Sequence, residues 1–485
     1  MSHDPAVLPR LRSILPPHCI ITDPQAKKPF ETDGLTAVKQ IPWLVVLPES
    51  IEQVRAVVRV CREHRVALVA RGAGTGLSGG ARPAADGILL GLSKLSRILE
   101  IDPDNRIARV EPGVRNLAIS EAAAPYGLYY APDPSSQIAC SIGGNVAENS
   151  GGVHCLKYGL TVHNVLGLKV LTIEGDELTL GGATLDTPGY DLLAVFNGSE
   201  GMLGIVTEVT VRLLPIPAVK RLVLAAFATL QTAADAVGKI IAGGIVPAGL
   251  EMMDARAIAA AEAFVGAGYP TDAAAILLCE LDGTHDEVEE QCAQVVRVMR
   301  TAHATELRTS RDDADRERMW LGRKAAFPAV GRIAPDYYCM DGTIPRARLG
   351  EVLRAIAQLS VEFELAVANV FHAGDGNLHP LILYDANAPG QLDRAEQMGG
   401  RILALCVRVG GTVTGEHGVG VEKLDAMCGQ FAAPELEQFH RLKAAFDPAG
   451  LMNPGKAVPT LARCAEIGGM HVHRGKIAFA DIERF

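Results

Sequence analysis

The sequence lacks the segments that mark membrane-spanning and secreted proteins. None of its apolar runs approaches the ~18 uninterrupted residues that a spanning helix needs. The N-terminal segment MSHDPAVLPRLRSILPPHC carries charges and prolines where a secretory signal needs an apolar centre. We therefore predict a cytoplasmic protein with no transmembrane segment, whose attachment to the inner membrane, if any, is peripheral and made through partner subunits.

Paired cysteines and an excess of basic charge are also missing. The ten cysteines are scattered without a C-x-x-C pair, which argues against a disulfide framework, a zinc ribbon or an iron–sulfur cluster in this chain. The net charge is −10 and the pI about 5.8. Because phosphate backbones are bound by basic surfaces, no nucleic-acid partner is expected.

The pattern of apolar residues divides the chain into four regions. Residues 1–40 are predicted to form a short helical lead-in. Residues 41–218 alternate strand and helix patterns, with an amphipathic helix expected after Ser50, and end at two closely spaced prolines. Residues 219–457 combine helical stretches with short strands such as AILLCELDG, as in a separate α+β domain. Residues 458–485 form a tail without an evident role. The class predicted for the whole chain is α+β.

Three glycine-rich segments in the strand-and-helix region predict a site for an extended phosphate-bearing cofactor. They are 71-RGAGTGLSGG-80, 132-PDPSSQIACSIGGNVAENSGG-152 and 198-GSEGMLGIVTEV-209. Glycines leave backbone N–H groups open to close approach by a pyrophosphate. The first segment follows a strand but lacks the lysine of a P-loop and the spacing of a Rossmann fingerprint. The alternative for this motif taken alone is a glycine-rich hairpin in a surface loop.

Two segments near the C-terminal end, 372-HAGDGNLH-379 and 414-TGEHGVG-420, predict a divalent-metal site. On a straight strand His372 and His379 would lie ~23 Å apart and on opposite faces. They can meet only if the chain reverses between them, and the intervening Gly-Asp-Gly-Asn is typical of a tight turn. Two imidazoles with a carboxylate from a second loop suit zinc, iron or manganese. The alternative is a chance pair among 13 histidines.

The order of these motifs, followed by DYYCMDGTIPR at 336–346 and FDPAGLMNPGK at 446–456, resembles the FAD-linked oxidase family. The branch is the one that contains 2-hydroxy-acid dehydrogenases. The resemblance implies a two-part FAD-binding domain of the vanillyl-alcohol-oxidase (PCMH) type, followed by an α+β substrate domain with an antiparallel sheet. It further implies FAD-dependent oxidation of a small 2-hydroxy acid, most simply glycolate to glyoxylate, with D-lactate and D-2-hydroxyglutarate as alternatives.

The resemblance also assigns residues to the cofactor. The first loop would hold the FAD pyrophosphate, the second would line the dinucleotide and isoalloxazine, and the third would pack against the adenosine side. Because the first loop contains no histidine, the FAD is predicted to be non-covalent, although Cys140 and His154 remain as attachment points. The implied cofactor residues are Arg71, Gly72, Ala73, Gly74, Thr75, Gly76, Gly79, Pro132, Asp133, Ser136, Gly143, Gly144, Asn149, Gly151, Gly152, Gly204, Ile205, Val206 and Asn453.

The family's metal ligands correspond to His372, His379 and Glu416. By the same resemblance, Asn377 bonds the substrate, His417 acts as the base and Arg323 pairs with the substrate carboxylate. The alternatives are a fourth ligand or an orienting residue for His417, a turn residue with positive φ for Asn377 and a surface arginine for Arg323.

One position departs from the hydroxyglutarate-specific relatives, because Cys339 stands where they have a lysine. This departure favours a small monocarboxylate. Nothing in the sequence resembles a nicotinamide site, so electrons are expected to leave through companion subunits, including one with iron–sulfur clusters. The competing interpretations are a non-catalytic flavin-binding assembly subunit and a metallohydrolase without flavin.

Overall fold

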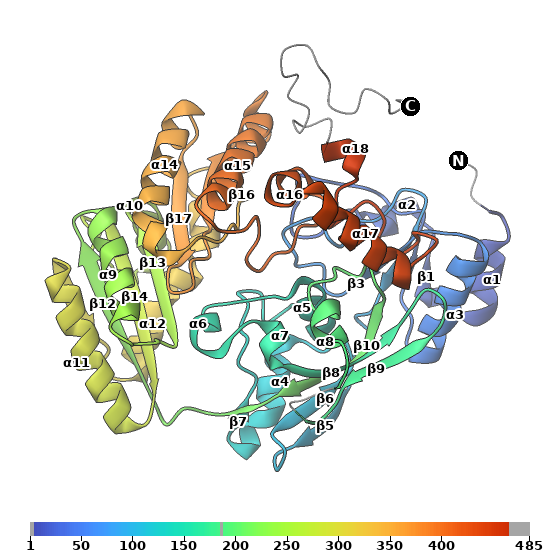
Figure 1. Ribbon diagram of the computed structural model, residues 1–485, viewed down its shortest axis with the longest axis horizontal. Coiled ribbons are helices and arrows are strands. Elements are labelled where there is room, and N and C mark those ends of the chain that lie inside the picture. The colour runs from blue at the N-terminus through green and yellow to red at the C-terminus, as the bar shows by residue number, and fades with distance from the viewer. Residues whose placement is uncertain (1–3, 185–187, 465–485) are drawn as a thin grey trace.

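The computed structural model describes residues 4–184 and 188–464, which form two parts with mixed α and β structure (Figure 1). The first part contains the N-terminal strands and is drawn in blue to green. The second part, drawn in yellow-green to orange, is built on a separate sheet. This confirms the α+β class. Residues 465–485 of the predicted tail lie outside the described residues.

The first sheet has the strand order β1-β2-β4-β3, with β4 parallel to both β2 and β3. Ser50 caps α3 by accepting a hydrogen bond from the Gln53 N–H, as its position before an amphipathic run predicts. The lead-in is only partly helical, because β1 pairs antiparallel with β2 and so joins this sheet. The elements are α1 (Val7–Ile14), β1 (Ile20–Ile21), α2 (Pro24–Lys27), β2 (Leu44–Val46), α3 (Ile51–Glu63), β3 (Leu68–Arg71) and β4 (Ile88–Gly91).

The second sheet is antiparallel, in the order β5-β6-β10-β8-β9, and completes the first part with a small β7-β11 pair. Its inner side chains pack on α5, which begins in the second glycine-rich segment. The elements are β5 (Ile98–Asp102), β6 (Ile107–Val110), α4 (Asn116–Ala123), β7 (Leu128–Tyr129), α5 (Ile142–Glu148), α6 (Cys155–Tyr158), α7 (Thr161–Asn164), β8 (Val165–Leu171), β9 (Glu177–Gly181), α8 (Leu192–Phe196), β10 (Ile205–Arg212) and β11 (Leu214–Pro215).

The second part is a seven-stranded antiparallel sheet in the order β15-β12-β14-β13-β17-β18-β16. Alternate residues of β12 enter two different cores, with Val223 and Phe227 in one and Leu222 and Leu224 in the other. Helices α9, α11, α14 and α15 cover the first face, and α10, α12 and α13 cover the second. Because both faces are covered, apolar side chains predominate on the central strands.

The elements of this part agree with the antiparallel substrate domain that the sequence predicts, and β14 coincides with the predicted strand AILLCELDG. The elements are β12 (Val219–Phe227), α9 (Leu230–Ala242), β13 (Gly249–Asp254), α10 (Ala255–Val265), β14 (Ala275–Gly283), α11 (His285–Thr301), β15 (Glu306–Thr309), α12 (Asp313–Lys324), α13 (Ala326–Val330), β16 (Asp336–Cys339), α14 (Leu349–Glu362), β17 (Val367–His372), β18 (Pro380–Tyr384) and α15 (Gln391–Arg408).

The chain then returns to the first part through α16 (Leu424–Gln430), α17 (Ala433–Phe446) and α18 (Leu461–Cys464), drawn in red in Figure 1. The Asn453 N–H donates to the Leu68 carbonyl over 2.8 Å, next to a bridge between Leu68 and Met452. The last stretch of the predicted 219–457 domain is therefore bonded to the edge of the first sheet.

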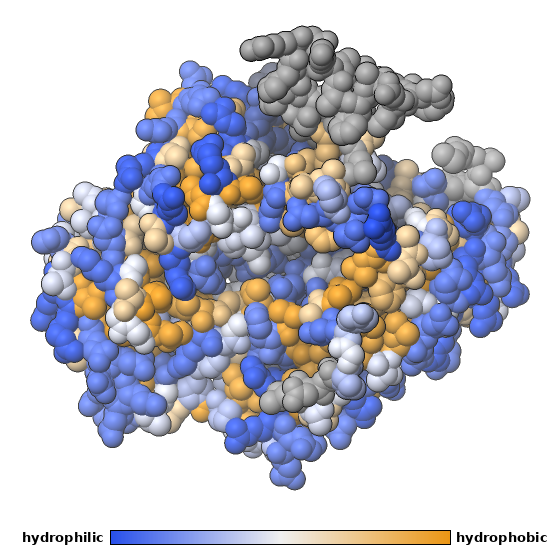
Figure 2. Space-filling model, viewed as in Figure 1, coloured by the Kyte–Doolittle hydropathy of each residue, from blue (hydrophilic) through white to orange (hydrophobic). Residues whose placement is uncertain are grey.

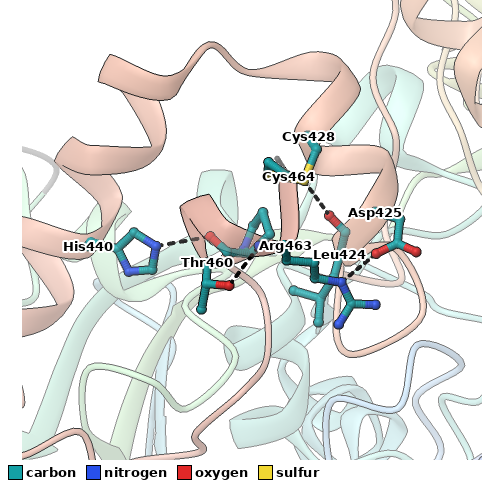
Figure 3. Close-up of a disulfide and its surroundings, with 8 residues drawn as sticks. Leu424, Asp425, Cys428, His440, Thr460, Arg463 and Cys464 are labelled. Carbon is teal, nitrogen blue, oxygen red and sulfur yellow. Dashed lines mark hydrogen bonds and ion pairs between the residues drawn. A yellow bond between two sulfur atoms is a disulfide. The ribbon is translucent and has the colours of Figure 1, made fainter. Parts of the chain in front are cut away.

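A disulfide between Cys428 and Cys464 joins α16 to α18 (Figure 3). The sequence argued against a disulfide framework, and the Cys428–Cys464 bond is an exception to that prediction. The other eight cysteines are free. The two cysteines are 36 residues apart, and only the packing of the C-terminal helices brings them together. Sequence spacing carries no such information. Arg463 and Asp425 form an ion pair beside the same contact.

The face shown in Figure 2 is mainly hydrophilic, with hydrophobic patches between the charged side chains. Within residues 4–184 and 188–464, no helix has the length and apolar character needed to cross a bilayer.

Candidate functional site

A cavity of about 640 Å³ lies where the two parts meet. Its wall contains residues from all three glycine-rich segments, together with the predicted metal-binding cluster from the second part. Most of the predicted cofactor residues line it, namely Arg71, Gly72, Ala73, Gly74, Thr75, Gly76, Asp133, Ser136, Gly143, Gly144, Gly151, Gly204, Ile205 and Val206.

The glycines at this wall permit close packing of one loop on another. A Cβ at Gly72 would lie 2.1 Å from the Ser141 hydroxyl at the start of α5, and Gly74 adopts φ +73° against the Arg71 guanidinium. A larger residue at either position would push the first loop away from the second. The narrow crevice that results is suited to an elongated dinucleotide.

Five predicted cofactor residues do not line the cavity, namely Gly79, Pro132, Asn149, Gly152 and Asn453. Asn453 donates to the carbonyls of Gly80 (3.0 Å) and Glu200 (2.6 Å), so it ties the first glycine-rich segment to the third. Asn149, at φ +55°, accepts from the Val162 N–H. Asn453 and Asn149 therefore tie loop segments to one another.

His372 and His379 meet because β17 and β18 pair antiparallel on either side of the turn. Gly376 takes the left-handed conformation at φ +87°, so the positive φ falls on this glycine and not on Asn377. The two imidazole centroids are 5.0 Å apart, which confirms that the motif brings the two rings together. Glu416 Oε1 lies 3.5 Å from His372 Nε2 and 2.9 Å from His379 Nε2.

Both imidazoles are oriented through their other nitrogen. His372 Nδ1 lies 2.9 Å from Glu251 Oε1, and His379 Nδ1 lies 3.3 Å from the Met340 carbonyl. Each Nδ1–H therefore has an acceptor, and the Nε2 atoms converge on Glu416, as in carboxylate–histidine–metal arrangements. The ligand atoms of His372, His379 and Glu416 lie within 4.8 Å of one another.

The charge of this cluster also fits a cation. Burial alone would raise the pKa of Glu416, but the imidazoles of His372 and His379 hold it well below its ordinary value. The carboxylate is thus ionised beside two imidazole nitrogens, and this donor set suits a divalent metal.

The loop that carries Glu416 and His417 is fixed by a buried carboxylate. Asp341 Oδ2 accepts hydrogen bonds from the N–H groups of Gly415 (3.1 Å), Glu416 (2.9 Å) and His417 (2.7 Å). The ammonium group of Lys423 pairs with the other oxygen of Asp341, and neither side chain is exposed. This anchor sets the direction in which Glu416 and His417 leave the loop.

His417 lines the cavity and stacks on His379, with centroids 5.0 Å apart and planes inclined by 9°. Burial lowers the pKa of His417 to about 4, so the ring is neutral at neutral pH. Its Nε2 lies 3.7 Å from Glu416 Oε1, and its Nδ1 faces Asp341 at 3.9 Å.

Arg323 lies on α12, lines the cavity and is 5% exposed, so it is not a surface arginine. Its Nη2 is 2.6 Å from Glu251 Oε2. Glu251 therefore joins Arg323 to His372. Asn377 is buried next to Gly415 and does not line the cavity. Cys339 is buried beside His379, with its Sγ 3.9 Å from His379 Nδ1.

Sequence reasoning missed Glu251, Asp341 and Lys423. Glu251 lies in the middle of β13 and contacts residues more than 70 positions away, which no local pattern reveals. Asp341 falls within the family motif at 336–346 and carried no assigned role. For Lys423, the one signal in the sequence was its place shortly after the predicted metal-ligand loop.

Comparison with known proteins agrees with the geometry. Residues 42–181 match the family model of the FAD binding domain, and residues 216–457 match that of the FAD linked oxidases, C-terminal domain. The chain is 61% identical to "Glycolate oxidase subunit GlcD" of Escherichia coli K12, over 99% of this chain and 96% of the relative. It is 37% identical to the subunit of the same name from Bacillus subtilis (90% and 93% covered) and 32% identical to the D-lactate dehydrogenase of Archaeoglobus fulgidus (89% and 95%).

Solved structures show the same fold at low sequence identity. p-Cresol methylhydroxylase superimposes with a TM-score of 0.78 at 19% identity, over 94% of this chain and 97% of that one. Alkyldihydroxyacetonephosphate synthase gives 0.75 at 18%, over 94% and 86%. The fold is that of the vanillyl-alcohol-oxidase (PCMH) type. From these matches and the cavity geometry, the chain belongs to the FAD-linked oxidase family and is an FAD-linked oxidoreductase.

Proposed function

We propose that the protein oxidises glycolate to glyoxylate at a site that joins flavin and metal chemistry. The observation that carries this proposal is the convergence of His372, His379 and Glu416 on the cavity formed by the glycine-rich loops. Further support comes from the 61% identical relative that is named as a glycolate oxidase subunit.

Each chemical task has a residue in position. Arg323, held by Glu251, binds the substrate carboxylate. His417 is neutral and accepts the hydroxyl proton at Nε2, because that nitrogen faces the cluster. A divalent ion of zinc, iron or manganese, when bound by His372, His379 and Glu416, lowers the pKa of the substrate hydroxyl, and bound FAD offers N5 as the hydride acceptor.

Asn377, predicted to bond the substrate, has its side-chain oxygen buried without a hydrogen-bond partner. We assign it to the support of the Glu416 loop, where it packs against Gly415. The FAD is held without a covalent bond in this proposal. Electrons pass to a companion subunit with iron–sulfur clusters, and from there to quinone.

A D-lactate dehydrogenase is the second candidate, since a 32% identical relative carries that name. A D-2-hydroxyglutarate dehydrogenase is less favoured, because Cys339 is buried and supplies no cation for a second carboxylate. A non-catalytic assembly subunit would have no need of the complete set of imidazoles and carboxylates. A flavin-free metallohydrolase is excluded by the family assignment.

The choice of substrate is tested by anaerobic bleaching of the flavin absorbance. We expect glycolate to reduce the flavin at least about tenfold faster than D-lactate and D-2-hydroxyglutarate at equal concentration, since a missing or extra carbon in a fitted pocket is worth a factor of this order. Faster bleaching by D-lactate would move the assignment to that enzyme. A flavin that none of the three acids reduces would refute oxidation of 2-hydroxy acids by this chain.

A further inference from the structure

A charged bridge connects the two parts of the molecule beside the cavity. His154, just after the second glycine-rich segment, has its Nδ1 2.7 Å from Asp133 Oδ2 and its Nε2 3.0 Å from Glu280 Oε1. The His154 N–H also donates to Asp133 Oδ1 over 3.1 Å. Asp133 lines the cavity from the first part, and Glu280 belongs to β14 of the second part. One imidazole therefore joins the two parts.

The bridge continues to the opposite wall of the cavity. The second oxygen of Glu280 accepts a hydrogen bond from the Trp320 indole N–H, in a contact that is almost fully buried. Trp320 lines the cavity on α12, one turn before Arg323. The chain of contacts from Asp133 through His154 and Glu280 to Trp320 thus spans from the flavin side of the cavity to the substrate side.

The bridge is ionic at neutral pH. Burial on its own would lower the pKa of His154, but the carboxylates of Asp133 and Glu280 raise it to about 10. Burial would likewise raise the pKa of Glu280, but hydrogen bonding and charge from His154 lower it to about 2. The charged groups Arg316, 3.9 Å from Glu280 Oε2, and Lys220 also face the cluster. Two titratable groups do so as well, Tyr129 and Cys155, and burial together with nearby carboxylates, Asp133 among them, raises the pKa of each.

In this arrangement His154 can neither act as a proton acceptor for the substrate nor attach the cofactor covalently. Both ring nitrogens already have carboxylate partners, so neither is free to bond a flavin or to receive a proton from a substrate. The neighbouring pair of Lys157 and Asp282 crosses the same boundary, which indicates that this face of the first part is built to fix the second part in one position.

We propose that His154 is a positioning residue that holds Trp320, and with it the α12 wall that carries Arg323, at a fixed place over the flavin loops. The proposal rests on the family assignment and not on glycolate as the substrate. The competing explanation is that the bridge stabilises the fold alone and has no effect on the cavity.

The first test uses the holoenzyme and Trp320 as its own reporter. The chain has two tryptophans, so a Trp43→Phe background leaves Trp320 as the only tryptophan, and its emission is read apart from that of the flavin. We expect its emission maximum to shift when His154→Gln is added, and to stay unchanged with His285→Gln, a matched change at an exposed histidine of α11. An emission spectrum that His154→Gln leaves unaltered contradicts the proposal.

The pH dependence gives a readout that a purely structural role would not move. Because the pKa of His154 is raised in the folded protein, its contribution to stability is complete below about pH 6.5 and declines as pH rises toward 10. The Trp320 emission should therefore titrate near pH 10 in the background protein and lose this step in His154→Gln. The same step in both proteins would overturn the proposal.

Kinetics and a double variant complete the test. We expect His154→Gln to raise KM for the 2-hydroxy acid about fivefold with kcat changed less than about twofold, the pattern of a lost binding contribution. The Glu280→Gln variant should show the same rise in KM. The KM of the double variant should be no higher than that of either single variant, since both substitutions remove the same contact. Additive losses, or an unchanged KM in both single variants that retain FAD, would contradict the proposal.

Discussion

Replacing Glu416 with glutamine is expected to slow reduction of the flavin by glycolate about a thousandfold, equivalent to ~4 kcal/mol of activation free energy. Glutamine keeps the shape of the side chain but removes the negative charge that faces His372 and His379. A divalent ion would then lose one of its three protein ligands, and His417 would lose the carboxylate beside it. Stopped-flow absorbance under anaerobic conditions measures this rate directly.

Glu437→Gln is the matched control, because Glu437 lies on α17 and pairs with Arg441 at the surface. We expect this control to reduce its flavin at the rate of the unaltered protein. Both variants should retain FAD, since a loss of cofactor would explain slow reduction without any role for the carboxylate. A Glu416→Gln protein that contains FAD and is reduced within about threefold of the normal rate would contradict the proposed site.

Asp341→Asn is expected to lower the free energy of unfolding by about 3–5 kcal/mol, the usual cost of removing one partner of a buried ion pair. Lys423 would keep its charge at a position with no exposure to water. The N–H groups of Gly415, Glu416 and His417 would also face an amide in place of a carboxylate. Denaturant unfolding at saturating FAD measures the change.

Asp393→Asn provides the comparison, because Asp393 lies exposed in the first turn of α15. Its unfolding free energy should stay within ~0.5 kcal/mol of the unaltered protein, as for most surface changes. If Asp341→Asn were no less stable than this control, the buried pair would not anchor the loop. Weaker metal binding in Asp341→Asn is expected in parallel, because the same loop carries Glu416.

Local patterns foretold much of the fold. The helix after Ser50, the strand AILLCELDG and the reversal between His372 and His379 each arise from short-range chemistry, namely a cap, an apolar run and a glycine turn. The strand order of the seven-stranded sheet and the return of Asn453 to Leu68 could not be foretold. Both depend on contacts between distant segments.

In the candidate site, too, local motifs predict some residues, while others depend on contacts between distant segments. The glycine-rich loops, the two imidazoles and Glu416 stand in recognisable motifs, and the structure brings them to one cavity. The residues that orient them, Glu251 and Asp341, are single acidic positions within other elements. Asn453 belongs to a motif, yet it bonds to two of the loops and does not line the cavity. A motif shows which residues belong together, but their contacts decide which ones face the cavity.

The most direct test of metal-assisted oxidation is the rate of flavin reduction by glycolate before and after chelation of the holoenzyme. We predict that chelation slows anaerobic bleaching at least about a hundredfold while the FAD remains bound, and that zinc, iron or manganese restores the rate. Metal-free protein, verified by elemental analysis, that bleaches at the original rate would contradict metal-assisted oxidation at His372, His379 and Glu416.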